Sequence, residues 1–501
     1  MYTVSPDEIK NADALAVSKY GISELTLMKN AARGCADIIC RIASRKDRIV
    51  ILCGKGNNGG DGYELASIFG KLCLNVAVIN VFDCEPTGKT AFSVYKSCKD
   101  YGTEIYASDM YDAVIDGASI VIDAIFGTGF SGKVTRNSKI GAIIEKANAT
   151  NALRIAIDVP SGINCGDGSI SEVNFNAFMT ITMAYAKTGL FSLPARDYCG
   201  EIRVIDIGYP KEMESDISFD GIIPDSSYIT GVFPERKKNS HKGDFGQLLT
   251  YCGSPFMTGA AILCANAALR SGVGLVNIAR DEKTLSVLQN HLTEPIFSPL
   301  SADVYERQSE FLKLSQKATA CLIGCGMGKD EGDAAVCEHI IKNVKTPIIL
   351  DADGINAIAA NKHILREAAE TPVITPHPLE FSRLIGKEVS EIQQNRLSLA
   401  REFAKEYGCV VVLKGASTVT ASPDGFAAVN TTGSSGLAKG GSGDVLAGLI
   451  ASFRAQGMSA FDSAASGVFL HGLACDILCR TSSERSVLPS DLITVISSLL
   501  P

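Results

Sequence analysis

Short apolar runs rich in β-branched residues alternate with helical stretches along most of this chain, and that alternation constrains the fold more than any other feature. In the first half, the runs lie at residues 49–53, 75–82, 120–125, 155–159, 179–183 and 202–207. Runs of this length, bounded by turn residues, are typical of strands that are buried on both faces. Strands that alternate with helices form a mostly parallel sheet covered by helices on both sides. We therefore predict an α/β fold.

The alternation is interrupted between residues 209 and 236, where the chain is polar and contains Pro210, Pro224 and Pro234. Such a composition is typical of a linker between domains. A second series of strand-like runs follows, at residues 247–252, 275–278, 320–323, 348–350, 373–374 and 410–413. A chain of 501 residues is also too long for one ordinary hydrophobic core. We predict two three-layer α/β domains, at residues 1–212 and 235–501, with a linker at residues 213–234.

The amino-acid composition limits which binding partners and which cellular compartment we expect for this protein. The hydrophobic fraction of 46% is that of a globular protein, and the net charge of -8 argues against nucleic acid or an anionic membrane as the main partner. We see no secretion signal and no run of about 18 apolar residues that could span a membrane. The 16 cysteines lack a disulfide-type spacing and many lie in apolar runs. We therefore expect reduced thiols that act as small core residues in a cytoplasmic protein.

A glycine-rich segment follows the first strand-like run. Its sequence is GKGNNGGDG at residues 54–62, and a helix is expected from about Tyr63. A strand, a glycine turn and a helix N-terminus together form an anion site, because free backbone N–H groups and the helix dipole attract a phosphate. The segment lacks the Gly-Lys-Ser/Thr ending of a Walker motif. It therefore indicates a phosphate-binding loop of another kind.

Two aspartates of the first half lie at the ends of predicted strands. Asp123 leads to GTGFSGK at residues 127–133, and Asp158 opens DVPSG at residues 158–162. Either aspartate alone could simply cap a loop, but ligands of open α/β sheets bind at the carboxyl ends of strands. All six histidines lie in the second half. Acid–base chemistry in the first domain would therefore use a carboxylate or a bound water, with Asp158 and Asp123 as the best candidates.

The second half carries five motifs near its predicted strands. They are HKGDFG at residues 241–246, GCGMG at 324–328, TPHPLE at 375–380, KGAST at 414–418 and GGSGDVL at 440–446. The last motif opens a helix, so its backbone N–H groups could hold a polyphosphate or a developing anion. Asp444 would lie close to that phosphate as a base, although an aspartate at a helix start can also be a simple N-cap.

In this order, the three motifs of the first half resemble the YjeF N-terminal domain family, the NAD(P)HX epimerases, over about residues 1–212. Residues 27–32, LMKNAA, also look like that family's early helix. The resemblance implies a Rossmann-like fold, interconversion of the R and S forms of hydrated NAD(P)H, and a catalytic Asp158. It implies a potassium ion held by Asn58, Asp123 and Ser161, whose oxygens suit a hard cation. The implied substrate contacts are Asn57, Asn58, Gly59, Gly60, Asp61, Gly127, Thr128, Gly129, Phe130, Ser131, Gly132, Lys133 and Asp158.

The motifs of the second half resemble the ribokinase-like superfamily and, more narrowly, the ADP- or ATP-dependent NAD(P)HX dehydratases, over about residues 235–501. The resemblance implies that Asp444 is the base that activates the substrate hydroxyl. The implied nucleotide contacts are Lys414, Gly415, Ala416, Ser417, Thr418 and Gly443. The implied contacts to the hydrated dinucleotide are Gly326, His377 and Asp444. Lys439 departs from the family pattern, in which a small or hydroxylated residue is expected, so the nucleotide preference stays open.

Both resemblances name the same damaged metabolite, which implies a repair enzyme with two activities. The first domain would equilibrate the two forms of NADHX or NADPHX. The second would place a nucleotide phosphate on the hydroxyl of the S form, because phosphate leaves more readily than hydroxide. Magnesium would bridge the phosphates. Family habit favours ADP over ATP and a homo-oligomer, and the sequence does not rank NADHX against NADPHX.

Two other functions remain open at this stage. The second domain could be a small-molecule kinase that acts on a vitamin alcohol, because such kinases share the fold and the anion loop. The first domain could be a ligand-binding module without activity, because a Rossmann-like fold does not fix function. The fused first domain argues against the kinase, and the complete loops around Asp123 and Asp158 argue against the inactive module.

Overall fold

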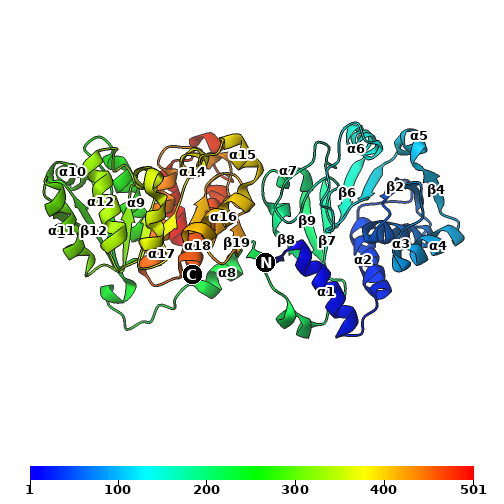
Figure 1. The fold of residues 1–501 in the computed structure, drawn as a ribbon, viewed down its shortest axis with the longest axis horizontal. Coiled ribbons are helices and arrows are strands. Elements are labelled where there is room, and N and C mark those ends of the chain that lie inside the picture. The colour runs from blue at the N-terminus through cyan, green and yellow to red at the C-terminus, as the bar shows by residue number, and fades with distance from the viewer. The chain divides into compact units, whose positions relative to one another are not determined.

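A computed structural model describes residues 1–501, and the chain divides into two compact units (Figure 1). One unit is Tyr2–Gly221, and the other is Ile222–Pro501 together with Met1. The segment expected as a linker contains helix α8 (Ser226–Val232), whose Ile229 is buried in a core of the C-terminal unit. From Ile222 onward, that segment is therefore part of the second unit. None of the helices has both the length and the apolar character needed to cross a membrane.

The N-terminal unit is built on a seven-stranded parallel sheet in the order β4-β3-β2-β5-β6-β7-β9. The strands are β2 (Arg48–Cys53), β3 (Asn75–Asn80), β4 (Glu104–Ala107), β5 (Ile120–Ala124), β6 (Leu153–Ile157), β7 (Met179–Met183) and β9 (Glu201–Ile205). The strand order reverses between β2 and β5. A parallel sheet leaves a crevice for ligands at the carboxyl ends of its strands where the order reverses.

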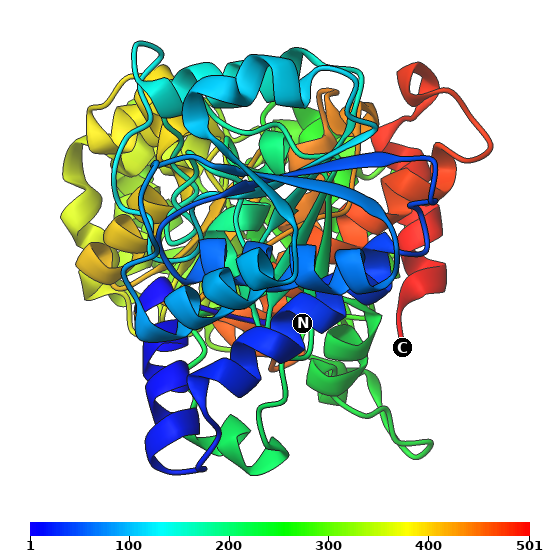
Figure 2. The same ribbon diagram turned by 90° about the vertical axis from the view of Figure 1, so that its right-hand side faces the viewer.

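Helices cover both faces of this sheet, which confirms the predicted three layers. They are α1 (Pro6–Ser18), α2 (Glu24–Ile39), α3 (Asn57–Lys71), α4 (Lys89–Asp100), α5 (Tyr111–Ile115), α6 (Lys139–Ala149) and α7 (Arg196–Cys199). Along β2, Ile49 and Ile51 face the core under α1–α4, whereas Val50 and Leu52 face the core under α5 and α6. Figure 2 shows the blue helices on one side of the strands and cyan helices on the other.

The C-terminal unit contains seven parallel strands in the order β13-β12-β11-β14-β15-β16-β17, and antiparallel strands β18 and β19 continue the sheet. They are β11 (Gln247–Tyr251), β12 (Leu275–Arg280), β13 (Ile296–Pro299), β14 (Ala320–Ile323), β15 (Ile348–Leu350), β16 (Val373–Ile374), β17 (Val410–Leu413), β18 (Val419–Ala421) and β19 (Ala427–Val429). The order reverses between β11 and β14, so this unit also has a crevice of the kind that binds ligands.

Helices also cover both faces of the second sheet. They are α9 (Thr258–Arg270), α10 (Glu282–Leu288), α11 (Val304–Ser315), α12 (Glu331–Asn343), α13 (Asp353–Ile358), α14 (Pro378–Ile385), α15 (Val389–Gln394), α16 (Arg396–Tyr407), α17 (Ser442–Ala455), α18 (Ala460–Leu478) and α19 (Pro489–Leu499). Leu248 of β11 shares a core with Ile450 of α17. On the opposite face, the Tyr251 ring meets Phe311 of α11 edge-on, with ring centroids 5.7 Å apart. The predicted α/β fold is therefore confirmed in both units.

Candidate active sites

A cavity of about 650 Å³ opens where β2, β5 and β6 end in the N-terminal unit. It is lined by most of the residues expected to contact substrate: Asn57, Asn58, Asp61, Gly127, Thr128, Gly129, Phe130, Ser131, Gly132 and Asp158. Gly59 and Gly60 are buried within α3, and Lys133 is exposed and is not among the lining residues. The structure thus brings the three motifs of the first half to one cavity.

The glycine-rich loop is shaped by close backbone packing. A Cβ on Gly54 would lie 2.0 Å from the carbonyl oxygen of Ile125, and a Cβ on Gly59 would lie 2.0 Å from that of Gly54. Side chains at these positions would therefore displace the backbone. The N-terminus of α3 follows at Asn57, and Gly56 provides no side-chain cap. Free N–H groups in the first turn of α3 can therefore donate hydrogen bonds to an anionic ligand.

Asp158 follows β6 and is held by four donors. Its Oδ2 accepts hydrogen bonds from the Thr128 amide at 2.8 Å and from the Thr128 hydroxyl. Its Oδ1 accepts from the Lys187 ammonium at 2.8 Å and from the Thr182 hydroxyl at 3.3 Å. Burial raises the pKa of Asp158, but the Lys187 charge and the hydrogen bonds outweigh it and hold the pKa below its ordinary value. Asp158 is therefore an anion in the cavity at neutral pH.

Asp61 lines the same cavity, but the pKa of its carboxyl group is shifted in the opposite direction. Its carboxyl group is buried and has no hydrogen-bond or ion-pair partner. Burial, and then the negative charge of Asp158, raise the pKa of Asp61 well above its ordinary value. Two carboxyl groups whose pKa values are pushed apart can serve as a proton donor and a permanent anion. The motif included Asp61 as a contact, but its protonation depends on Asp158 and could not be read from the motif.

The three residues expected to hold potassium form one network through Phe126. Asn58 Nδ2 donates to the Phe126 carbonyl at 2.8 Å, and the Phe126 amide donates to Ser161 Oγ at 3.1 Å. The Ser161 hydroxyl and amide donate to the two oxygens of Asp123, each at 2.7 Å. Asn58 Oδ1 is buried without a partner, and burial raises the pKa of Asp123 to about 6. An unpaired buried oxygen in a network with a buried carboxylate suits a bound cation.

A second cluster lies where β15, β16 and β17 end in the C-terminal unit. Asp351 directly follows β15, and its Oδ1 accepts hydrogen bonds from Lys414 Nζ at 2.7 Å and Thr375 Oγ1 at 2.6 Å. Asp444, in the first turn of α17, has a carboxylate oxygen within 4.8 Å of an Asp351 oxygen and of Cys325 Sγ. Burial, and then the charge of Asp351, raise the pKa of Asp444 to about 7. A carboxyl group that titrates near neutrality suits general acid–base chemistry.

The N-terminus of α17 lies beside this cluster. Its N-cap, Gly441, has a φ of +100° and provides no side-chain cap. A Cβ on Gly443 would lie 3.4 Å from Lys414 Nζ, so the ammonium lies next to the first turn of the helix. Ser442 Oγ and His471 Nε2 are buried without partners. Free helix N–H groups and an adjacent lysine form a site for a phosphate or another anion.

The expected nucleotide loop at residues 414–418 is supported from below by Arg396. The fully buried Arg396 guanidinium donates to the carbonyls of Leu413 at 2.7 Å and Lys414 at 3.2 Å. Gly415 has a φ of +143°, and a Cβ there would lie 3.1 Å from that guanidinium. The Thr418 hydroxyl donates to the Gly415 carbonyl at 2.7 Å. The backbone of this loop is therefore fixed in a turn. The Lys414 side chain points from the turn toward Asp351.

His377 adjoins the cluster through Glu380. Its Nδ1 accepts from the amides of Leu379 at 3.1 Å and Glu380 at 3.3 Å, which caps α14. Its Nε2 lies 3.2 Å from one oxygen of Glu380, whose other oxygen lies 3.9 Å from Lys414 Nζ. Burial, and then the positive charge of Lys414, lower the pKa of His377. A neutral His377 whose Nδ1 accepts hydrogen bonds carries its proton on Nε2.

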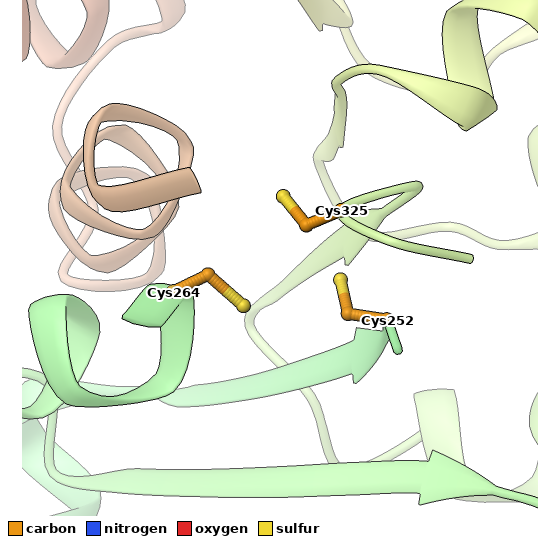
Figure 3. Close-up of side chains that lie close together, drawn as sticks. All are labelled: Cys252, Cys264 and Cys325. Atoms are coloured by element: carbon orange, nitrogen blue, oxygen red, sulfur yellow. The ribbon is translucent and has the colours of Figure 1, made fainter. Parts of the chain in front are cut away.

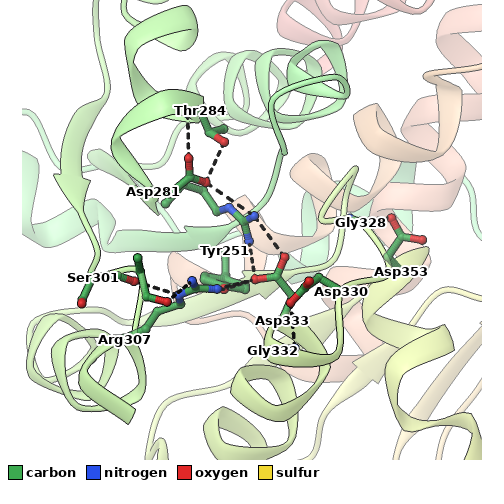
Figure 4. A network of polar contacts seen from close by, with 12 residues as sticks. Tyr251, Asp281, Thr284, Ser301, Arg307, Gly328, Asp330, Gly332, Asp333 and Asp353 are labelled. Atoms are coloured by element: carbon green, nitrogen blue, oxygen red, sulfur yellow. Dashed lines mark hydrogen bonds and ion pairs between the residues drawn. The ribbon is translucent and has the colours of Figure 1, made fainter. Parts of the chain in front are cut away.

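A buried ion network supports the loop that contains Gly326 (Figure 4). Asp333 of α12 pairs with Arg280 at 3.2 Å and Arg307 at 2.9 Å, and it also accepts a hydrogen bond from Tyr251. Close to this network, the Gly328 amide donates to Asp353 Oδ2 at 3.0 Å. Because a buried carboxylate paired with two guanidinium groups resists displacement, the network holds the start of α12 against the strand ends.

Sequence reasoning missed several side chains of both sites. They are Lys187, Thr182, Asp351, Cys325 and Arg396. Asp351 ends a buried strand, and the rule that identified Asp158 would have found it. Lys187 could have been noticed only as a charged residue within the mostly apolar segment that follows β7. Lys439 does not point into the phosphate site: its Nζ donates to the Arg485 carbonyl at 2.8 Å.

Two family models match this chain. "YjeF-related protein N-terminus" matches residues 24–189, and "NAD(P)H-hydrate dehydratase" matches residues 248–498. These matches cover the two units in the order that the motifs predicted.

Curated relatives match over the full length. A bifunctional NAD(P)H-hydrate repair enzyme of Moorella thermoacetica is 34% identical over 100% of this chain and 97% of its own. The enzyme of the same name from Escherichia coli is 31% identical over 99% of this chain and 93% of its own. A solved structure of the ADP/ATP-dependent NAD(P)H-hydrate dehydratase of Bacillus subtilis, co-crystallised with ATP/Mg2+, is 30% identical over 55% of this chain and 96% of its own, with a TM-score of 0.47.

Proposed function

This chain belongs to the family of bifunctional NAD(P)H-hydrate repair enzymes, and we propose that its two units divide the repair between them. The N-terminal unit interconverts the R and S forms of hydrated NADH and NADPH. The C-terminal unit dehydrates the S form at the expense of a nucleotide. The observation that carries this division is that each unit has its own carboxylate site, at the carboxyl ends of its own sheet.

In the N-terminal cavity, Asp61 donates a proton to the substrate, and Asp158 supplies the negative charge that stabilises the cationic intermediate. The hydrated ring carbon bears a hydroxyl next to the ring nitrogen. Transfer of the Asp61 proton to that hydroxyl lets water leave while the nitrogen lone pair forms the C=N bond. Asp158, whose oxygens already accept four hydrogen bonds, remains ionised and stabilises the cationic ring. Water then adds to the other face and returns a proton to Asp61.

We place a potassium ion at Asn58, Asp123 and Ser161. The unpaired buried Asn58 Oδ1 supports this assignment, because such an atom is costly without a partner. When bound, the ion supplies positive charge that favours the ionised form of Asp123. Through Phe126 this network fixes the loop that presents Thr128 to Asp158.

In the C-terminal site, Asp444 accepts the proton of the substrate hydroxyl as the oxygen attacks the terminal phosphate of the nucleotide. Lys414 and the N–H groups of α17 stabilise the charge that develops on the phosphoryl oxygens. Elimination then breaks the C–O bond to phosphate and a C–H bond on the adjacent ring carbon, which forms the C=C bond of NAD(P)H and releases phosphate and a proton, with AMP as the other product if ADP is the donor. Magnesium, when bound, neutralises phosphate charge, and Asp351 Oδ2, which only the weak Cys325 thiol donor approaches at 3.7 Å, suits it.

The remaining assignments follow the motifs. We propose that the nucleotide contacts residues 414–418 and Gly443, and that the hydrated dinucleotide contacts Gly326, His377 and Asp444. The first cavity would bind the same dinucleotide through the residues that line it. We also propose ADP as the donor, a homo-oligomer and a cytoplasmic location, on the strength of the family's fused architecture.

The test is recovery of the reduced-nicotinamide absorbance from epimeric NADHX with magnesium and either ADP or ATP. Full recovery with one nucleotide supports both activities and identifies the donor. Recovery that stops at the S fraction, when spontaneous epimerisation is slow, overturns the epimerase assignment. No recovery with either nucleotide overturns the dehydratase assignment and favours the small-molecule kinase. A chromatographic assay of the two epimers then measures the first unit alone.

A further inference from the structure

Three buried thiols lie together next to Asp444. Cys252 directly follows β11, Cys325 lies in the loop after the neighbouring strand β14, and Cys264 lies on α9 (Figure 3). Their Sγ atoms all lie within 4.8 Å of one another, and each residue is at most 1% exposed. Three segments that are distant in the sequence thus contribute one sulfur each to a single cluster.

This cluster differs from the protein's other buried cysteines. Of the 16 cysteines, only these three form a group of three thiols that could hold one ion. Cys475 and Cys479 approach each other at 3.9 Å, but their neighbour is the hydroxyl of Ser434 rather than a third sulfur. A lone buried cysteine is usually a small apolar residue. Three converging sulfurs beside carboxylates call for another explanation.

We propose that Cys252, Cys264 and Cys325 form a binding site for a thiophilic d10 metal ion, either Zn2+ or Cu+. Metal–thiolate bonds of about 2.3 Å place tetrahedral sulfurs roughly 3.8 Å apart. The present separations, all within 4.8 Å, reach that geometry with small side-chain rotations. Soft thiolate ligands select these ions over the hard Mg2+ and K+ that the two active sites would use. Each metal–sulfur bond replaces one S–H bond, and the thiol proton leaves to solvent.

The carboxylates beside the cluster offer a fourth ligand. Cys325 also belongs to a second group, in which its sulfur lies within 4.8 Å of oxygens of Asp351 and Asp444. Asp351 Oδ1 is already held by Lys414 and Thr375. The Asp444 carboxyl group forms no ion pair, its hydrogen-bond partner is the Cys325 thiol, and it is only partly buried, so it can turn toward the ion and also marks the route of entry. Zn2+ would therefore bind three sulfurs and Asp444, whereas Cu+ is satisfied by three sulfurs alone.

This geometry predicts a metal that inhibits one activity only. An ion that binds Asp444 removes the base of the C-terminal site and fixes Cys325, which adjoins Gly326. Dehydration should stop while epimerisation in the N-terminal unit continues. This consequence rests on the proposed role of Asp444, whereas the metal site itself does not.

The test uses the reduced full-length protein under anaerobic conditions, with Co2+ as a spectroscopic probe of the zinc site. We expect thiolate-to-cobalt charge-transfer bands that saturate at a single equivalent, and that Zn2+ displaces. The bands should be lost in Cys264→Ser and in Cys325→Ser. Cys321→Ser is the matched control, because Cys321 is also fully buried but lies outside the cluster. Thermal melting shows that each variant is folded.

Bands of equal intensity in wild type, C264S and C325S would overturn the proposal, as would their absence from the wild type. A parallel titration with Cu+ distinguishes the two ions. Asp444→Asn should weaken Zn2+ binding and leave Cu+ binding unchanged. Equal Zn2+ affinities of D444N and the wild type would overturn the assignment of Asp444 as the fourth ligand. None of these measurements depends on enzyme activity, so their failure is distinct from a failure of the proposed repair function.

Discussion

The Lys187 ammonium lies 2.8 Å from Asp158 Oδ1, and the Lys187 side chain is 0% exposed. Little solvent screens this pair, because the Asp158 side chain is only 11% exposed, so the Lys187 charge strongly stabilises the Asp158 carboxylate. Lys187 also donates to Thr182 Oγ1 at 2.8 Å and to the Met183 carbonyl at 3.0 Å, which fixes its position. The pair therefore shapes the electrostatics of the N-terminal cavity: Lys187 helps to hold the pKa of Asp158 low, and the Asp158 charge adds to burial in raising the pKa of Asp61.

Replacement of Lys187 by Met should destabilise the protein by about 3 kcal/mol, because it leaves Asp158 buried without a counter-charge. The pKa of Asp158 is lowered in the folded state, so its contribution to stability is present above the unfolded pKa and is lost as pH falls through the folded value. In acid, the free energies of unfolding of the variant and the wild type should therefore become nearly equal. Urea unfolding at neutral and acidic pH measures both effects. Lys133→Met, at an exposed lysine near the same cavity, is the control and should change little.

Replacement of Asp158 by Ala should abolish epimerisation and leave dehydration of the S form intact. The reason is that the anion which stabilises the cationic ring is lost in one unit, while Asp444 is untouched in the other. Separate assays of epimer exchange and NADH recovery on the pure S form measure the two activities. Asp444→Asn should have the opposite effect: it should abolish dehydration and leave epimerisation intact. A parallel loss of both activities in either variant would contradict independent sites.

Most strands that sequence analysis identified have continuous apolar runs; an exception is the edge strand β9, whose apolar residues alternate with polar ones. Central strands such as β2 and β5 are buried on both faces, so their composition alone marks them. The missed strands lack this signal. Strands β4 and β13 lie at sheet edges and contain exposed residues, and β18 and β19 have only three residues each. The edge strands β4 and β13 pair with strands that lie beyond an intervening helix, which local composition does not report, whereas β18 and β19 pair with near neighbours in the sequence but are too short for composition to mark them.

The residues of the two sites likewise fall into those that could be predicted from the local sequence and those that could not. Residues held by the local backbone, such as Asn58 in the glycine-rich loop and Asp444 at a helix start, belong to motifs and could be predicted. Lys187 acts through a partner that is 29 residues away in the sequence: it lies on the short strand β8 (Ala186–Lys187) after β7, and only the tertiary fold brings it to Asp158 at the end of β6. The pKa of Asp444 likewise depends on Asp351, which lies outside every motif that we used.

The dehydration rate should rise with pH through a pKa of about 7, because Asp444 acts as a base only when deprotonated. Asp351→Asn removes the negative neighbour that raises this pKa, so the rising limb should move to lower pH. The limb is measured as kcat against pH with saturating nucleotide and S-form substrate. Glu370→Gln, at an exposed surface acid, is the control. A limb at the same pH in D351N and wild type would mean that another group titrates.

Epimerisation should depend on potassium through Asn58 Oδ1, the buried oxygen that has no partner. Asn58→Ala removes this ligand and should abolish the difference in rate between potassium and a bulky organic cation such as choline. Asn57→Ala is the matched control: Asn57 lines the same cavity but is exposed, so its variant should keep the response to potassium even if substrate binding weakens. A potassium response that persists in N58A would place the ion elsewhere. If neither variant nor the wild type responds to potassium, the unpaired oxygen has another partner, such as water.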